Sequence, residues 1–211
     1  MNRASRKLAV AGVMTALAAV AFAPAARAGT PISLTSVSPT AGVWGTTFTM
    51  NGTTAANRQV RVQRMYVGAN QWQDVTTTTS DDDGKFSTAD QPLAHAWYRA
   101  FLTSDLSTSN WVKAQVRPGV HLGVGRSGEQ AVFSGRVLPG HPGSRVLLQM
   151  FDGINKEWVT VKTARLNSSS FYRINYKATD NGRRLFRVAW PTQDNNHLWN
   201  LSAWVWVTWT R

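Results

Sequence analysis

Residues 145–163 have the sequence RVLLQMFDGINKEWVTVKT, in which two alternating apolar runs flank a turn. Val146 and Leu148 precede the turn residues Asp152-Gly153, and Val159 and Val161 follow them, each next to polar or charged neighbours. An apolar period of two is typical of half-buried strands, and Asp-Gly favours a tight turn between them. The stretch therefore predicts a β-hairpin.

The same pattern occurs once more, at residues 59–77, QVRVQRMYVGANQWQDVTT. Val60-Arg-Val-Gln63 corresponds to Val146-Leu-Leu-Gln149, and Trp72 to Trp158. Such internal repetition predicts two domains of one kind. The other correspondences are Gly45 and Gly52 with Gly128 and Gly135, Phe86 with Tyr172, Tyr98-Arg99 with Phe186-Arg187, and Ser109-x-Trp111-Val112 with Ser202-x-Trp204-Val205.

The repeats predict an all-β protein. About seven short strands per repeat, separated by turns every 8 to 12 residues, are typical of an immunoglobulin-like or fibronectin-III-like antiparallel β-sandwich. We expect domain 1 at residues 29–117 and domain 2 at residues 118–211, joined by a short link at Arg117-Pro-Gly119 that restricts their relative orientation. Trp72 and Trp158 are expected to cap the two cores.

The second repeat resembles a known group of proteins. It is similar to the immunoglobulin-like or fibronectin-III-like repeats of exported actinobacterial proteins, many of them of unassigned function. The residues that carry the resemblance are Gly135-Arg-Val, Val146-Leu-Leu-Gln149, Trp158-Val, Tyr172, Phe186-Arg-Val188 and Ser202-Ala-Trp-Val205. The resemblance covers about residues 40 to 210. It implies a sandwich fold, a secreted bacterial setting and a binding or spacer role, and it names no catalytic residue.

Residues 1–28 have the three parts of a secretory signal peptide. A basic start that includes Arg3 and Lys7 precedes the apolar run Leu8–Ala23, and Ala26-Arg-Ala28 is a cleavage pattern of small residues. The alternative is an uncleaved anchor over Leu8–Ala26, which has just the length to span a bilayer. No later segment is long and apolar enough to do so. We expect a secreted protein, non-covalently associated with the cell surface if it is held there.

The charge of the chain is concentrated in the second repeat. Removal of residues 1–28 takes away four basic residues, so the formal charge falls from +12 to +8. Residues 29–117 carry seven Lys and Arg against six acidic residues, whereas residues 118–211 carry twelve against five. An anionic partner would meet the second domain first. The chain has no cysteine, so each domain must rely on its apolar core.

The C-terminal strand is the strongest candidate binding site. Its alternation places Trp204 and Trp206 on one face and Val207 and Trp209 on the other. The equivalent strand of the first repeat carries Lys113 beside Trp111, which indicates that the Trp204 and Trp206 face points outward. These two residues, with Arg187 at the rim and Trp199 as a further aromatic, could form a platform for a sugar ring or an apolar partner.

The same residues have a structural alternative. The guanidinium of Arg187 could stack on Trp204, as that of Arg99 could on Trp111, in an internal ladder worth roughly 0.5 to 2 kcal/mol. Since both repeats keep the Arg and the Trp, the ladder is favoured for Trp204. Trp206 stands where the first repeat has a lysine, so recognition and structure remain equally open there.

No catalytic residue, metal site or cofactor is predicted. The histidines His95, His121, His141 and His197 have no partner at i+2 or i+4. Asp81-Asp-Asp-Gly84 could hold calcium but is better explained as a solvated turn. Gly123-x-Gly-x-x-Gly128 precedes a strand, which argues against a dinucleotide site. No G-x-S-x-G elbow is present, and a hydrolase would need a polar cleft at the Pro118 junction.

The sequence favours a non-enzymatic binding protein of the bacterial envelope. Its second domain would bind an anionic cell-wall polymer or polysaccharide through basic faces and exposed tryptophan. The alternative is a structural or protein-interaction module whose outward tryptophans join domains or chains. Nucleic acid is not expected as a partner of an exported protein.

Overall fold

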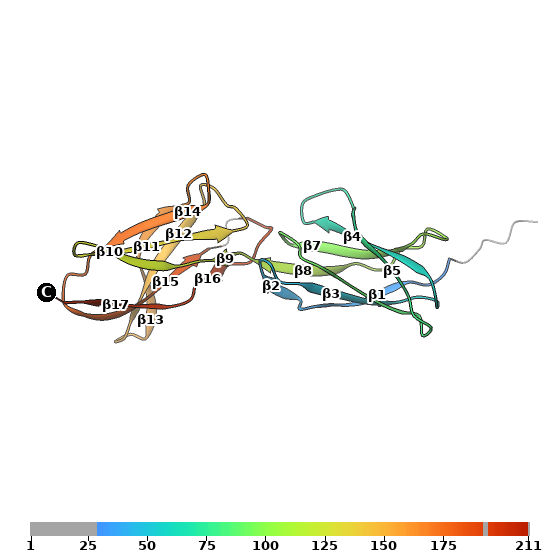
Figure 1. Ribbon diagram of the computed structural model, residues 1–211, viewed down its shortest axis with the longest axis horizontal. Coiled ribbons are helices and arrows are strands. Elements are labelled where there is room, and N and C mark those ends of the chain that lie inside the picture. The colour runs from blue at the N-terminus through green and yellow to red at the C-terminus, as the bar shows by residue number, and fades with distance from the viewer. Residues whose placement is uncertain (1–28, 192–193, 211) are drawn as a thin grey trace, which may run out of the picture.

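The computed structural model describes residues 29–191 and 194–210, and these residues form two β-sandwiches in series (Figure 1). The predicted signal peptide, residues 1–28, lies outside the described residues. Within the described part the elements are strands joined by turns, and no helix there has the length and hydropathy to span a membrane.

The first sandwich packs a three-stranded sheet, in the order β1-β3-β6, against a five-stranded sheet, in the order β2-β8-β7-β4-β5. All pairings are antiparallel except β2 with β8, which is parallel. The strands are β1 (Ser33–Ser38), β2 (Ala41–Val43), β3 (Phe48–Thr53), β4 (Gln59–Tyr66), β5 (Gln73–Thr79), β6 (Lys85–Asp90), β7 (Ala96–Leu102) and β8 (Val112–Arg117).

The second sandwich repeats this plan. One sheet has the order β10-β11-β14, with β9 also paired to β11; the other has the order β13-β12-β15, with β16 and β17 paired to β15. The strands are β9 (Gly119–Val120), β10 (Gly123–Ser127), β11 (Gln130–Leu138), β12 (Arg145–Asp152), β13 (Glu157–Arg165), β14 (Phe171–Tyr176), β15 (Gly182–Trp190), β16 (Asn200–Leu201) and β17 (Val205–Trp209).

The hairpin predicted from residues 145–163 is β12 paired with β13, and its counterpart is β4 paired with β5. Both hairpins shift register at the same place, after Val62 in the first and after Leu148 in the second. A bulge repeated at equivalent positions is a feature of the fold and not a local defect. The predicted fold class, two tandem immunoglobulin-like sandwiches, is therefore confirmed.

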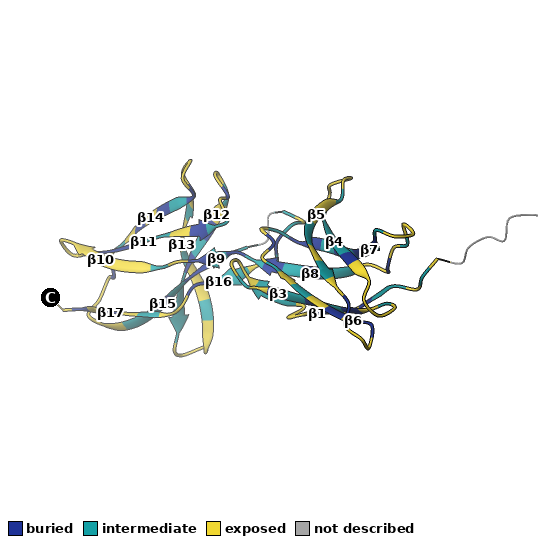
Figure 2. Ribbon diagram, turned by 45° about the vertical axis from the view of Figure 1, so that its right-hand side comes forward, coloured by how far each residue is buried: buried dark blue, intermediate teal, exposed yellow. Residues whose placement is uncertain are grey.

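Each sandwich encloses its own apolar cluster (Figure 2). In the first, Tyr98 and Met50 are fully buried, and in the second the rings of Phe133 and Phe186 lie 4.8 Å apart. Neither cluster includes Trp72 or Trp158. The expectation that these two residues cap the cores was wrong, because each lies on the outer face of its sheet.

A glycine in each repeat is required by a close approach of backbone. A Cβ atom on Gly135 would overlap the carbonyl oxygen of His121, and one on Gly52 would overlap that of Ser33. In the second sandwich the Tyr172 hydroxyl also donates a hydrogen bond to this His121 carbonyl, at 2.6 Å. The repeated glycine thus lets the first segment of each sandwich pass close to the strand beside it, β3 or β11.

Gly135→Ala is expected to lower the free energy of unfolding of the second sandwich by about 1–3 kcal/mol, the usual cost of overpacking. Gly153→Ala is the matched control, because a Cβ there has no neighbour within 4 Å. Chemical denaturation followed by tryptophan fluorescence measures both. Equal midpoints for the two variants would contradict the close-approach argument.

Candidate functional site

The outward face of β17 carries two exposed tryptophans, as predicted. Trp204 is 66% exposed and Trp206 is 53% exposed, whereas Val207 and Trp209 are buried. Trp111, the counterpart of Trp204 in the first sandwich, is also 53% exposed. Exposed indoles of this size are uncommon on a monomer surface and indicate either a ladder of stacked side chains or a recognition surface.

Arg187 belongs to a ladder of stacked side chains in the second sandwich. Its guanidinium lies 4.0 Å from the ring centre of Trp158, and its Nε donates to Gln149 Oε1 at 2.8 Å. Trp158 in turn contacts Trp204, with ring centres 6.3 Å apart. Burial lowers the pKa of Arg187 below its ordinary value. The order of the ladder is therefore Gln149, Arg187, Trp158, Trp204.

The first sandwich builds the same ladder. Arg99 lies 4.3 Å from the ring centre of Trp72 and donates to Gln63 Oε1 at 2.8 Å, and Trp72 contacts Trp111 at 5.2 Å. The prediction of a ladder was right, but its pairing was wrong in both repeats. The arginine stacks on the tryptophan of the neighbouring hairpin, because the bulge opposite the glutamine puts that indole on the face of the arginine.

Trp206 lies outside the ladder. The guanidinium of Arg183, not that of Arg187, lies over its ring, 4.4 Å from the centre. Trp206 also lines a hollow of about 230 Å³ between β10 and β17, together with Arg126, whose guanidinium donates to the Thr208 carbonyl. Arg183 thus covers the indole, and Arg126 lines the same hollow as Trp206.

Trp199 lies at the domain junction. Although its side chain is 55% exposed, its ring faces the guanidinium of Arg117 at 5.8 Å, and Arg117 Nη1 donates to its carbonyl oxygen at 3.2 Å. The sequence-based grouping of Trp199 with Trp206 is therefore not supported by its contacts, which are to the first sandwich.

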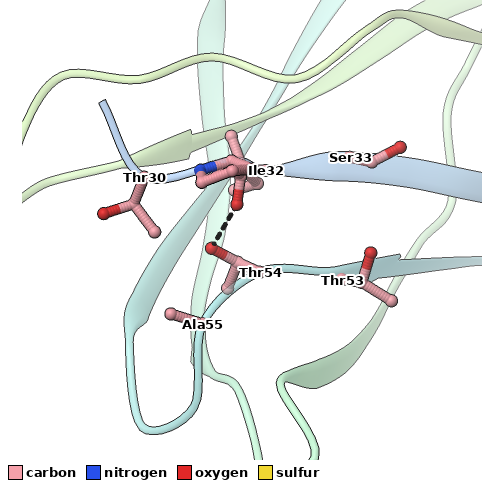
Figure 3. Close-up of a pocket in the computed structure, with 7 residues that line it drawn as sticks. Thr30, Ile32, Ser33, Thr53, Thr54 and Ala55 are labelled. Carbon is pink, nitrogen blue, oxygen red and sulfur yellow. Dashed lines mark hydrogen bonds between the residues drawn. The ribbon is translucent and has the colours of Figure 1, made fainter. Parts of the chain in front are cut away.

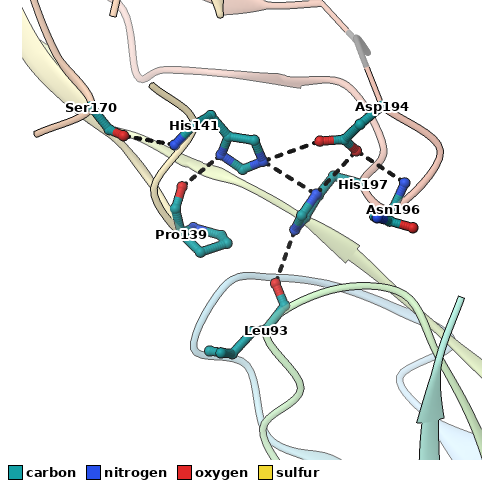
Figure 4. Close-up of polar contacts among 7 residues, drawn as sticks. All are labelled: Leu93, Pro139, His141, Ser170, Asp194, Asn196 and His197. Atoms are coloured by element: carbon teal, nitrogen blue, oxygen red, sulfur yellow. Dashed lines mark hydrogen bonds and ion pairs between the residues drawn. The ribbon is translucent and has the colours of Figure 1, made fainter. Parts of the chain in front are cut away.

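The junction also contains a cluster that the sequence analysis missed (Figure 4). His141 Nε2 lies 3.2 Å from His197 Nδ1 and 3.4 Å from Asp194 Oδ2, and His197 Nδ1 lies 3.2 Å from Asp194 Oδ1. Both histidines are buried. The sequence prediction considered partners only at i+2 and i+4, so it did not detect Asp194-x-x-His197. His141 was not recognised because it lies far from both residues along the chain.

Backbone hydrogen bonds on either side of His197 tie its loop to the first sandwich. The His95 N–H donates to the Asn196 carbonyl at 2.8 Å, and the Leu198 N–H donates to the Val116 carbonyl at 2.9 Å. His197 Nε2 itself lies 2.9 Å from the Leu93 carbonyl. Burial lowers the pKa of His95 to about 4, so this neighbouring histidine is neutral. The loop of the second sandwich is thereby docked on the first.

Two other sequence candidates find ordinary explanations. The carboxylates of the Asp81–Gly84 turn are used locally, since Asp81 accepts the Lys85 N–H at 2.7 Å and Asp82 accepts from Asn57 at 3.1 Å. The residues Gly123–Ser127 form strand β10. A dinucleotide site would require a helix after them, whereas β11 follows.

A pocket of about 340 Å³ lies where the chain enters the first sandwich (Figure 3). It is lined by residues 30–33 and 53–55, and the Thr54 hydroxyl donates to the Pro31 carbonyl across it at 2.9 Å. The lining holds no titratable side chain, so it offers shape but no acid, base or metal ligand.

Comparison with known proteins gives no family. No protein-family model matches the chain, and no curated protein matches it. Solved structures do. The D0-D1 domain of intimin is 12% identical over 83% of this chain and 96% of that one, with a TM-score of 0.31. The chicken interferon gamma receptor alpha chain is 9% identical over 86% and 96%, with a TM-score of 0.45.

A biofilm associated protein, through its BSP domain, is 16% identical over 76% of this chain and 27% of that one, with a TM-score of 0.28. None of the three is described as an enzyme. Identity and overlap are low in every case, and the fold assignment rests on the strand order given above.

The ladder predicts energetic coupling between Arg187 and Trp158. Arg187→Met and Trp158→Leu, alone and together, should give a coupling free energy of about 0.5–1 kcal/mol, the range of a partly exposed cation–π contact. Thermal unfolding of the four proteins measures it. A control cycle pairs Arg187→Met with Trp111→Leu in the other sandwich, where the changes should add. Additive effects in the first cycle would exclude the ladder.

Proposed function

We propose that this protein is an exported, non-enzymatic binding module whose second sandwich binds an anionic polysaccharide of the cell envelope at Trp206. The observation that carries the proposal is the exposed indole of Trp206, which contacts Arg183 and shares a hollow with Arg126, at a position where the first repeat has Lys113. The repeats share their core and ladder, so a residue that differs here is not demanded by the fold.

The chemistry of this hollow fits an acidic sugar. An indole face packs against the apolar C–H face of a sugar ring, and guanidinium groups donate paired hydrogen bonds to carboxylate or phosphate. Arg126 lines this hollow and donates to the Thr208 carbonyl. The ligand would therefore meet a positioned cation instead of having to order one.

The remaining charge of the second domain would act at longer range. Twelve basic against five acidic residues raise the local concentration of a polyanion, an effect that salt screens. Trp204, held at the end of the Arg187 ladder, extends the aromatic surface along the same face of β17. Trp199 would serve the domain junction instead.

A protein-interaction module is the second candidate, and the edge strand β10 favours it. All five residues of β10 are exposed, and among the described strands it pairs only with β11. An exposed edge can accept a further strand from another chain. Trp206 beside this edge would then be buried by a partner protein.

Co-sedimentation with purified Gram-positive cell wall tests the proposal. The exported chain, predicted to be residues 29–211, is expected to pellet at low salt and less at high salt. Trp206→Ala should weaken binding roughly tenfold, because one stacked aromatic contributes about 1–1.5 kcal/mol. Arg183→Gln should weaken it as well.

Trp111→Ala is the matched control, because Trp111 and Trp206 are equally exposed and lie on equivalent strands. It should pellet like the wild type. An equal loss of binding in both tryptophan variants would show that any exposed indole supports binding, and would contradict a specific site at Trp206. No pelleting under any condition, together with a dimer in light scattering that Trp206→Ala abolishes, would favour the interaction module.

A further inference from the structure

The cluster of His141, Asp194 and His197 presents three hydrogen-bond acceptors to one point. His141 Nδ1 lies 2.6 Å from the Pro139 carbonyl and His197 Nε2 lies 2.9 Å from the Leu93 carbonyl. A carbonyl can only accept, so each of these outer nitrogens carries its proton. In the neutral imidazoles the lone pairs then lie on His141 Nε2 and His197 Nδ1, which face one another at 3.2 Å.

Such an arrangement requires a cation. Two nitrogen lone pairs and a carboxylate repel one another unless a proton or a metal ion lies among them. The set therefore offers two imidazole nitrogens and one carboxylate to a single cation.

The distances fit a metal ion. Three atoms bound tetrahedrally to zinc at about 2.0–2.1 Å lie about 3.3 Å apart. The separations here are 3.2, 3.4 and 3.2 Å. They match the edges of a metal tetrahedron, although hydrogen bonds also reach about 3.2 Å.

The surroundings of the cluster are those of a built site. Each histidine donates its outer N–H to a backbone carbonyl, which fixes the ring and its tautomer as in many metal centres. The His141 backbone N–H donates to the Ser170 hydroxyl at 2.6 Å, and Ser170 is buried with a φ of 57°. The equivalent residue in the first repeat is Gly84, with a φ of 77°. A serine held in this unfavourable conformation gives His141 an anchor that glycine could not.

We propose that His141 Nε2, His197 Nδ1 and the Asp194 carboxylate bind one divalent late first-row transition metal, with Zn²⁺ as the expected ion, and that the ion fixes the loop of residues 194–198 against the first sandwich. Two imidazoles and a carboxylate are the ligand types that zinc takes. The half-exposed side of Asp194 leaves the fourth position to water. The proposal does not depend on the polysaccharide site.

The ion would act on the domain junction because His197 belongs to the metal site and also contacts the first sandwich. Its inner nitrogen binds the metal, its outer nitrogen bonds Leu93 of the first sandwich, and its chain neighbours bond His95 and Val116. Trp190, fully buried, packs on the His141 ring with centres 4.8 Å apart. Trp190 is thus one of the ten tryptophans that a paramagnetic ion in the cluster could quench.

Calorimetry with Zn²⁺ and visible absorption with Co²⁺, on the exported protein after tag removal and dialysis against a chelator, test the site. We expect one ion per chain, the absorption bands of tetrahedral cobalt, and quenching of tryptophan fluorescence by Co²⁺. His141→Gln should weaken Zn²⁺ binding at least about 100-fold, more than the loss of an outer-shell partner. Asp194→Asn, at a half-exposed and well tolerated position, should weaken it at least about tenfold.

His121→Gln is the matched control, since His121 is exposed, and it should bind as the wild type does. Absence of saturable Zn²⁺ and Co²⁺ binding to the wild type would overturn the site and assign the cluster to a shared proton. Binding that both His141→Gln and Asp194→Asn leave unchanged would overturn it too.

Hydrogen exchange of the His95 and Leu198 amides tests the effect on the junction. Zn²⁺ should slow exchange at both amides in the wild type and at neither in Asp194→Asn. Unchanged exchange in a protein that binds one ion would overturn the role of the metal in fixing the loop.

Discussion

No disulfide can join the two sheets of either sandwich, because the chain has no cysteine. This constraint leaves the sheets to be held by core packing and by polar contacts such as those of Arg64 and Tyr98 with Asp90. In the second sandwich it is met by a run of ring contacts through the core, from Phe133 to Phe186 and on to Trp209. On the outer face of the five-stranded sheet, the Gln149, Arg187, Trp158 and Trp204 ladder ties three strands together. Trp158 and Trp204 are thus part of this ladder, whereas Trp206 lies outside it.

The two repeats serve as an internal comparison. Both repeats have the glycine at a close approach of backbone, the bulge after Leu148 or its equivalent, and the ladder. These features belong to the fold. What they do not share marks chemistry that the fold does not require: Trp206 against Lys113, and Ser170 against Gly84. Both differences fall in the second sandwich, which also carries most of the net charge. The second domain thus combines a scaffold like that of the first with a distal aromatic hollow and a histidine cluster at the junction.

Much of the fold could be predicted from sequence because it depends on local alternation. The period of two located the strands, and comparison of the repeats assigned the outward face of β17 correctly. The pairing within the ladder could not be predicted, since a one-residue bulge at Val75 and Val161, opposite the glutamines, puts each indole on the face of the arginine. The histidine cluster could not be predicted either. His141 and His197 lie on different loops that meet only once both sheets are folded, although Asp194-x-x-His197 was a local sign of it.

The docked loop of residues 194–198 changes how the molecule carries a mechanical load. The chain enters at one end of the pair of sandwiches and leaves at the other, so tension between its ends passes through the single link at Arg117-Pro-Gly119 (Figure 1). The hydrogen bonds from His95, Leu198 and His197 run beside that link and connect the same two bodies. A pull between the ends would then load these parallel connections as well as the covalent hinge.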